Sequence, residues 1–135
     1  PYAAAAVLGF WFWATWDHMP AWENPEALWE RVLAQEPANL DAHENLGRYY
    51  LGQERHELSL KHLSQGKTYL SDNIHNRAFV LMRLKRLDEA DELLRQAEQR
   101  NPNEAKILNL RGSLYLERDD FANAEYYFRK SMEVP

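Results

Sequence analysis

The sequence predicts an all-α protein, a solenoid of helical hairpins with about three repeats, a preceding half-repeat and an apolar N-terminal helix. Glycine and proline are few, at 5 and 6 of 135 residues, while residues that favour helices are abundant. Matching residue types also return after 34 positions, as a period of stacked helical units would require. The pairs are Ala78 and Gly112, Leu81 and Tyr115, Ala90 and Ala124, and Leu94 and Phe128.

Composition narrows the range of functions. The formal net charge is −5 and the isoelectric point is near 5.5, whereas nucleic-acid-binding domains usually present a basic face. The chain has no cysteine, which removes disulfides, cysteine nucleophiles and thiolate metal sites. We therefore expect no nucleic-acid partner.

Residues 1–22 are expected to form an apolar, aromatic helix at a membrane. Residues 2–16 carry no charge, and three of the last six of them are tryptophan, a residue that suits a membrane interface. The stretch is shorter than the roughly 20 residues of a membrane span, so the alternative is a helix that caps the repeats. The first lysine or arginine is Arg31, which favours a non-cytoplasmic side, periplasm or lumen, for the repeats.

Residues 23–38 are expected to be the second helix of an earlier half-repeat. Trp29 takes the large position, Val32 the next core position and Pro37 the closing position. The chain begins at Pro1 and ends at Pro135, where another repeat is expected to start. We therefore expect a segment of a longer polypeptide.

Residues 39–135 are expected to form the repeat array, with units at about 39–70, 71–104 and 105–135. Small residues at Gly47, Ala78 and Gly112 allow the two helices of each hairpin to approach closely, and large residues fill the space between hairpins. Asn101-Pro102-Asn103 predicts a turn, with Asn103 as the N-cap of the next helix.

The motifs inside the units are more specific than the period. The first unit has His43-x2-Leu46-Gly47-x2-Tyr50, and the third has Leu108-x2-Arg111-Gly112-x2-Tyr115 followed by Ala124-x3-Phe128. This pattern resembles the tetratricopeptide repeat (TPR) family over residues 38–135. The resemblance implies a binding scaffold whose first helices line a concave surface.

The junction before the array carries a second resemblance. An aromatic apolar segment followed by Trp22, Leu28-Trp29, Pro37 and Asn39 is similar to transmembrane-and-TPR proteins, a group that includes lumenal O-mannosyltransferases. This resemblance implies that any transferase active site lies upstream of the chain.

No pattern in the chain predicts catalysis. His56-Glu57 is followed by His62, so the spacing of a zinc-binding HExxH motif is not met. No phosphate-binding glycine loop or nucleophile triad is present. We expect a non-enzyme without cofactor or metal.

The candidate binding residues lie beside the core stripe of the first helices. Asn45 and Asn76 share one repeat position, and in TPR arrays similar to O-GlcNAc transferase an asparagine ladder there holds a peptide backbone. An amide suits that role because it both donates and accepts; the alternative is that it bonds a neighbouring helix turn. The predicted set is Asn45, Arg48, His75, Asn76, Phe79, Arg83, Asn109 and Ser113.

Three functions remain open at this point. The first is a membrane-tethered scaffold that binds a protein or an extended peptide through its concave face. The second is the accessory domain of a polytopic membrane glycosyltransferase, and the third is a permanent structural subunit of a membrane complex. The oligomeric state is left open.

Overall fold

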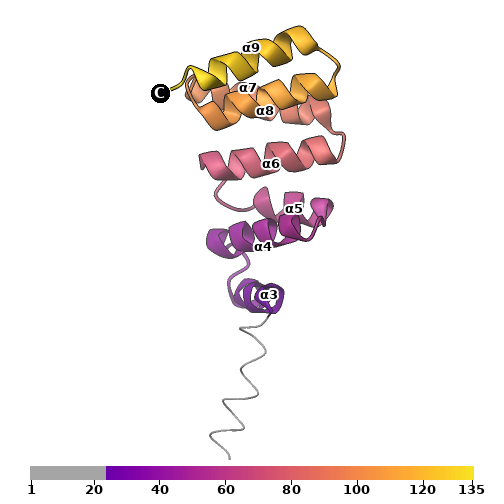
Figure 1. Ribbon diagram of the computed structural model, residues 1–135. Helices are drawn as coiled ribbons and strands as arrows, with labels where there is room; N and C mark the ends of the chain where they lie inside the picture. The colour runs from indigo at the N-terminus through magenta and orange to yellow at the C-terminus, as the bar shows by residue number, and fades with distance from the viewer. Residues whose placement is uncertain (1–23) are drawn as a thin grey trace, which may run out of the picture.

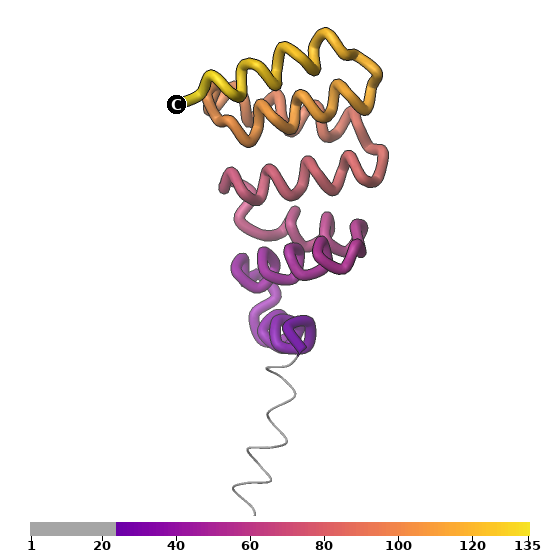
Figure 2. Tube along the Cα trace, in the orientation of Figure 1, coloured from indigo at the N-terminus to yellow at the C-terminus, as the bar shows by residue number. Residues whose placement is uncertain are grey.

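The computed structural model describes residues 24–135, which form seven α-helices and no strand. They stack in chain order into an elongated array, from indigo α3 to yellow α9 (Figures 1 and 2). The all-α solenoid is thus confirmed. The helices are α3 (Pro25–Gln35), α4 (Leu40–Gly52), α5 (His56–Leu63), α6 (Ser71–Arg83), α7 (Leu87–Arg100), α8 (Ala105–Glu117) and α9 (Phe121–Met132).

Three hairpins follow one leading helix. Helices α4 and α5, α6 and α7, and α8 and α9 pack as pairs, and α3 packs against α4. The apolar helix expected within residues 1–22, with its membrane role, lies outside the described residues. Of the helices in residues 24–135, none combines the length and the apolar character needed to cross a bilayer.

The turns inside the three hairpins repeat one backbone conformation. Glu54, Lys85 and Asp119 have φ angles of 57°, 59° and 57°, in the left-handed region that often ends a helix. The next N–H then donates at 2.9 Å to the carbonyl five residues earlier, at Tyr50, Leu81 and Tyr115. Each first helix therefore ends at the same repeat position, and the second helix starts in the same direction.

The small positions permit close approach, as the sequence predicted. A Cβ atom added to Gly47 would lie 2.6 Å from Cγ of Leu63, and one added to Gly112 would lie 2.7 Å from Cδ1 of Phe128. Both distances are too short for carbon atoms, so only glycine fits while the partner side chain stays in place.

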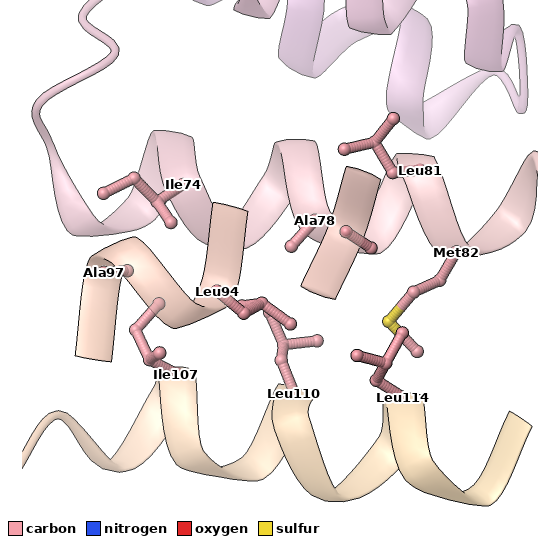
Figure 3. Packing of buried hydrophobic residues seen from close by; sticks show 10 residues of the cluster. Ile74, Ala78, Leu81, Met82, Leu94, Ala97, Ile107, Leu110 and Leu114 are labelled. Carbon is pink, nitrogen blue, oxygen red and sulfur yellow. The ribbon is translucent and has the colours of Figure 1, made fainter. Parts of the chain in front are cut away.

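The main core lies between the second and third hairpins. Figure 3 shows side chains of α6 and α7 meeting those of α8. Leu94 and Leu114 are fully buried there, and this apolar burial is the main force that stacks one unit on the next. The buried cluster contains Ile74, Ala78, Leu81, Met82, Ala90, Leu94, Ala97, Ile107, Leu110 and Leu114.

One predicted helix start is wrong. Helix α8 begins at Ala105 with Glu104, not Asn103, at the N-cap. Nδ2 of Asn101 donates to the Glu104 carboxylate at 3.0 Å, and the backbone N–H of Glu104 donates to the Asn101 carbonyl. These bonds make the turn one residue longer, which places Asn103 outside the helix.

Candidate partner-binding face

Helices α4, α6 and α8 form the inner surface of the stack, called here the concave face. The backbone of α6 contacts both α4 and α8. Among residues 24–135, no comparable backbone contact joins α5 to α7 or α7 to α9. Helices on the inside of a curve approach each other more closely than those outside, so the first helices line the concave side. Figure 1 shows them following one another along the stack.

All the predicted site residues lie on these three helices. Asn45 and Arg48 belong to α4, Asn109 and Ser113 belong to α8, and the other four belong to α6. Three of the predicted residues line one hollow of about 200 Å³ between α6 and α8. The lining is Phe79, Met82, Arg83, Lys85, Leu110, Ser113 and Glu117.

This hollow, called here the α6–α8 hollow, has an apolar floor and a charged rim. Met82 and Leu110 are buried, whereas the Phe79 ring is 40% exposed and available for contact. At the rim, Lys85 pairs with Glu117. Such a site takes an apolar side chain into the floor and polar groups at the edge.

Cations exceed acids on this part of the concave face. Asp72 pairs with Lys106 at 2.7 Å. The hydrogen bond from Lys106 is the main cause of the lowered pKa of Asp72, and Arg48 adds a smaller attraction. Within residues 24–135, Arg48 itself forms no ion pair.

The carboxylate of Glu117, like that of Asp72, lies near two cations. Its pKa is lowered mainly by the hydrogen bond from Lys85, with a smaller contribution from Arg83, and Arg83 forms no ion pair within the described chain. Each acid thus faces two cations. Glu44 of α4, which accepts from Nδ2 of Asn73 on α6, is a third acid near these four cations. The local surplus of positive charge is therefore small, and it stands against a net charge of −5 for the whole chain.

The asparagines of the predicted ladder differ from one another. Nδ2 of Asn45 donates to the Asp41 carbonyl one turn earlier, at 2.8 Å, which is the alternative role expected for this residue. The side chain of Asn76 forms no hydrogen bond within residues 24–135. Leu110 follows Asn76 by 34 residues, so the third unit has no amide at the ladder position. The asparagine ladder that would hold a peptide backbone therefore stays a prediction.

His75 lies beside the Asp72 and Lys106 pair. Burial is the main cause of its lowered pKa, and the positive charge of Lys106 lowers it further. Its buried Nδ1 has no hydrogen-bond partner within the described chain. The ring is therefore neutral near pH 7, and Nδ1 is free to accept or donate one hydrogen bond.

Sequence reasoning missed Leu110 and Lys85 at the hollow. Leu110 aligns with Asn45 and Asn76 in the repeat, so strict alignment of the third unit would have identified it. Lys85 lies in the turn after α6, where its left-handed backbone sets its direction. Helical periodicity predicts which side chains share a helix face, so it does not predict the direction of a side chain in a turn.

Comparisons with known proteins agree with this architecture. The family model of the tetratricopeptide repeat matches residues 25–67 and 76–132. A solved structure of MamA, labelled MSR-1, aligns with a TM-score of 0.71 and 24% identity, covering 81% of this chain and 64% of that one. A second MamA structure, labelled AMB-1, aligns with a TM-score of 0.70 and 25% identity, covering 81% and 61%. No curated protein matches the chain by sequence.

The chain spans less than two thirds of the length of these two MamA chains. The similarity of the junction to transmembrane-and-TPR proteins is not shown by these matches and stays a prediction. The family match extends over all three hairpins and the helix before them. On this evidence the chain belongs to the tetratricopeptide repeat family.

Proposed function

We propose that the chain is a non-catalytic scaffold that binds an extended segment of a protein partner on its concave face. The observation that carries the proposal is the α6–α8 hollow, with its apolar floor and surplus cations. Tetratricopeptide repeats serve in protein–protein interaction, which fits this surface.

The chemistry of the face defines the partner segment. A leucine or phenylalanine enters the hollow against Phe79 and Leu110, and an aspartate or glutamate near it pairs with Arg83. Arg48, on the neighbouring first helix, is available for a second acid. The half-buried amide of Asn76 lies on the same helix as Phe79 and can hold the backbone of an extended chain, because it offers both a donor and an acceptor.

The test begins with selection of short peptides from a random displayed library on the full chain. We expect enrichment of sequences with a large apolar residue close to an acid. Binding of the best peptide, followed by fluorescence anisotropy, should weaken about tenfold or more in Phe79→Ala and in Arg83→Ala, because each removes a central contact. Arg95→Ala on the outer helix α7 is the control and should bind as the wild type does.

The asparagines need a separate variant. Asn45→Ala combined with Asn76→Ala should weaken the same peptide while the helical melting curve stays nearly unchanged. Unchanged affinity would exclude a ladder, and a collapsed melt would show that the amides are structural. If peptide affinity is equal in the wild type, Phe79→Ala and Arg83→Ala, the concave face is not the binding site.

We also propose that the scaffold is held at a membrane by residues 1–22, with the repeats on the periplasmic or lumenal side. The support is the uncharged, tryptophan-rich sequence of residues 2–16 and the absence of a lysine or arginine before Arg31. Flotation of the full chain with lipid vesicles tests the tether. Recovery of the chain in the protein fraction, away from the lipid, would contradict it.

A further inference from the structure

A further hollow lies at the outer helix of the second hairpin, away from the concave face. It measures about 430 Å³ and is formed by one side chain of α6 and five of α7. Described hairpins precede and follow it in the stack, so its exposure does not depend on where the chain begins or ends. We call it the outer hollow, lined by Arg77, Asp88, Glu89, Glu92, Leu93 and Gln96.

The side chain from α6 is an arginine without a partner. Within residues 24–135, the guanidinium of Arg77 forms no ion pair and no hydrogen bond, and its Nε atom is buried. The residue as a whole is half-buried and reaches the outer hollow. Burial lowers the pKa of Arg77, and no carboxylate of the described chain is close enough to raise it. A charge withdrawn from water without a compensating partner costs free energy in the unbound chain.

The corresponding arginine of the next unit does have acidic partners. Arg111 follows Arg77 by 34 residues and bonds to Asp91 and Glu98 on the second helix of the preceding unit. Burial alone would lower the pKa of Arg111, but the bond to Glu98 and nearby negative charge raise it. An arginine at this repeat position is therefore stable when the preceding helix supplies carboxylates.

The second helix of the first unit does not supply them to Arg77. The small positions of the first two units are 31 residues apart, so Leu60 stands at the position of Asp91 and Lys67 at that of Glu98. Lys67 also lies beyond the end of α5. The arginine is thus kept in the second unit, while both of the acids that would bind it are replaced.

The acids that line the outer hollow are already engaged. Each of the three is bound to an arginine other than Arg77. The pairs are Asp88 with Arg118, Glu89 with Arg86, and Glu92 with Arg95, at N–O distances of 2.7, 2.6 and 2.7 Å. When these pairs are counted, one charge of the hollow remains uncompensated, and it is the positive charge of Arg77. The hollow therefore favours a single carboxylate.

We propose that the outer hollow binds a glutamate or aspartate side chain of a partner protein, held by the guanidinium of Arg77. A carboxylate matches the planar fork of an arginine. The partner supplies to Arg77 what Asp91 supplies to Arg111 within the chain, and the half-buried Leu93 offers apolar contact beside the acid. This inference does not rest on the proposed use of the concave face.

The test uses the full chain with Phe79→Ala and Arg83→Ala, so that peptides do not select the concave face. Two displayed libraries of short random peptides are compared, one with a fixed central glutamate and one with glutamine there. We expect enrichment from the glutamate library only. By fluorescence anisotropy, Arg77→Met should weaken the best peptide about tenfold or more. The matched control is Arg129→Met, at an exposed arginine of α9, which should leave the affinity unchanged.

A double-mutant cycle assigns the carboxylate to Arg77. Replacing the peptide's glutamate by glutamine should weaken binding about tenfold when Arg77 is present and should have little further effect in Arg77→Met. An equal loss in both chains would place the glutamate elsewhere and overturn the proposal. Equal enrichment from the two libraries, or full affinity in Arg77→Met, would also overturn it.

Urea unfolding separates a binding role of Arg77 from a structural one. Methionine keeps the unbranched stem and removes an unpaired charge, so the midpoint of Arg77→Met should equal or exceed that of the wild type. Arg111→Met leaves two acids without their partner, so its midpoint should fall. An equal fall in both variants would mean that Arg77 is already satisfied in the unbound chain, which overturns the proposal.

Two other sources of the carboxylate have their own signatures. Tighter peptide binding by Asp17→Asn combined with Glu23→Gln would assign Arg77 to acids of this same chain. Sedimentation that shows a dimer of the wild type, dispersed by Arg77→Met, would assign the outer hollow to a second copy. Either result would overturn binding of a partner's acid.

Discussion

At the scale of single residues, space inside the hairpins is the strictest requirement. Gly47 faces Leu63, which is fully buried and cannot move aside without disturbing its own neighbours. Gly52 lies on the same helix, and an added Cβ there would meet nothing within 4 Å. Alanine substitutions at these two glycines therefore separate the steric effect of a methyl group from the intrinsic preference of alanine for helix.

Gly47→Ala should destabilise the chain, and Gly52→Ala should stabilise it slightly. Overpacking costs about 1–3 kcal/mol, while replacing a helical glycine with alanine returns about 0.5–1 kcal/mol. We expect a net loss of about 1–2 kcal/mol for Gly47→Ala and a gain of about 0.5 kcal/mol for Gly52→Ala. Urea unfolding followed by circular dichroism measures both. Equal effects of the two variants would contradict the steric argument.

A contact between two histidine rings joins the helices of the first hairpin. Nε2 of His43 lies 3.0 Å from the Pro37 carbonyl, which only accepts, so Nε2 carries the proton. The bare Nδ1 of a neutral His43 then accepts from Nδ1–H of His62, at 3.0 Å. Burial is the main cause of the lowered pKa of His62, and repulsion from His43 and Lys61 lowers it further.

The stability of the chain should fall as pH decreases below the ordinary histidine value of 6.5. The unfolded chain binds the proton more tightly than the folded one, so acid favours unfolding in this window. His75 contributes in the same direction, because its pKa is also lowered. Acids whose pKa is lowered in the folded chain, such as Glu98, also reduce stability when they are protonated. Their effect begins only at lower pH, below about 4.5.

Urea midpoints at pH values of about 7.5 and 5.5 test the histidine effect. His62→Gln keeps a donor toward His43 but does not titrate, so it should lose less stability between the two pH values than the wild type does. An equal loss in both proteins would mean that His62 is not the group responsible.

At the scale of elements, polar contacts join helices where apolar burial is incomplete. Helix α3 has no buried residue, yet Glu26 accepts from the Tyr50 hydroxyl at 2.9 Å and from Arg55 at 3.0 Å. Burial first, and the bond to Glu26 second, raise the pKa of Tyr50 to about 12. The hydroxyl therefore stays protonated and keeps α3 attached to α4 over the physiological range.

Arg111 performs the corresponding role between α7, α8 and α9. Its guanidinium bonds to Glu98 and Asp91 of α7 and lies 4.6 Å from the centre of the Tyr127 ring on α9. Burial alone would raise the pKa of Glu98, but the bonds from Lys130 and Arg111 outweigh it and lower the pKa. One buried side chain thus connects three helices.

Arg111→Lys should destabilise the chain although the charge is kept. An ammonium group cannot bond both acids in a fixed fork or stack on the ring, and the loss of charged hydrogen bonds in a buried place costs about 1–3 kcal/mol. Arg95→Lys changes an exposed pair with Glu92 and should leave the urea midpoint unchanged. A wild-type midpoint for Arg111→Lys would show that the fork geometry contributes nothing.

The sequence predicted the helices better than their ends and contacts. Repeat spacing is sufficient to identify the hairpins and the small positions, because Gly47 and Gly112 are dictated by backbone approach. Repeat spacing is insufficient to identify the N-cap of α8. Asn103 was expected there, but the bond between Asn101 and Glu104 places it in the turn. Trp29 was expected at the large-residue position of a half-repeat, and in α3 it is only half-buried.

The candidate site, like the fold, could be predicted from the sequence only in part. Which residues lie on the concave face follows from helical periodicity, so the predicted residues all fall on α4, α6 and α8. Which of them line the α6–α8 hollow depends on the distance between two helices and on a turn that directs Lys85. Those are properties of the packed hairpins and not of any one helix.

At the scale of the whole molecule, the chain is a series of units that contact only their neighbours. Within the described residues, no helix of the first hairpin contacts a helix of the third. In such an array, stability is nearly a sum of unit terms and nearest-neighbour terms. A local defect should therefore open the structure locally before the whole array unfolds.

Hydrogen exchange of the Gly47→Ala variant tests this expectation. A loss of about 1–2 kcal/mol corresponds to roughly 5–30-fold faster exchange of the amides that open with the affected unit. We expect that acceleration in α3, α4 and α5, a smaller one in α6, and wild-type rates in α8 and α9. Gly112→Ala is the mirror variant, with its methyl group directed at Phe128, and should accelerate exchange in α8 and α9. If both variants accelerate all three hairpins equally, the units open together, and a partner bound at one end would stabilise the whole array.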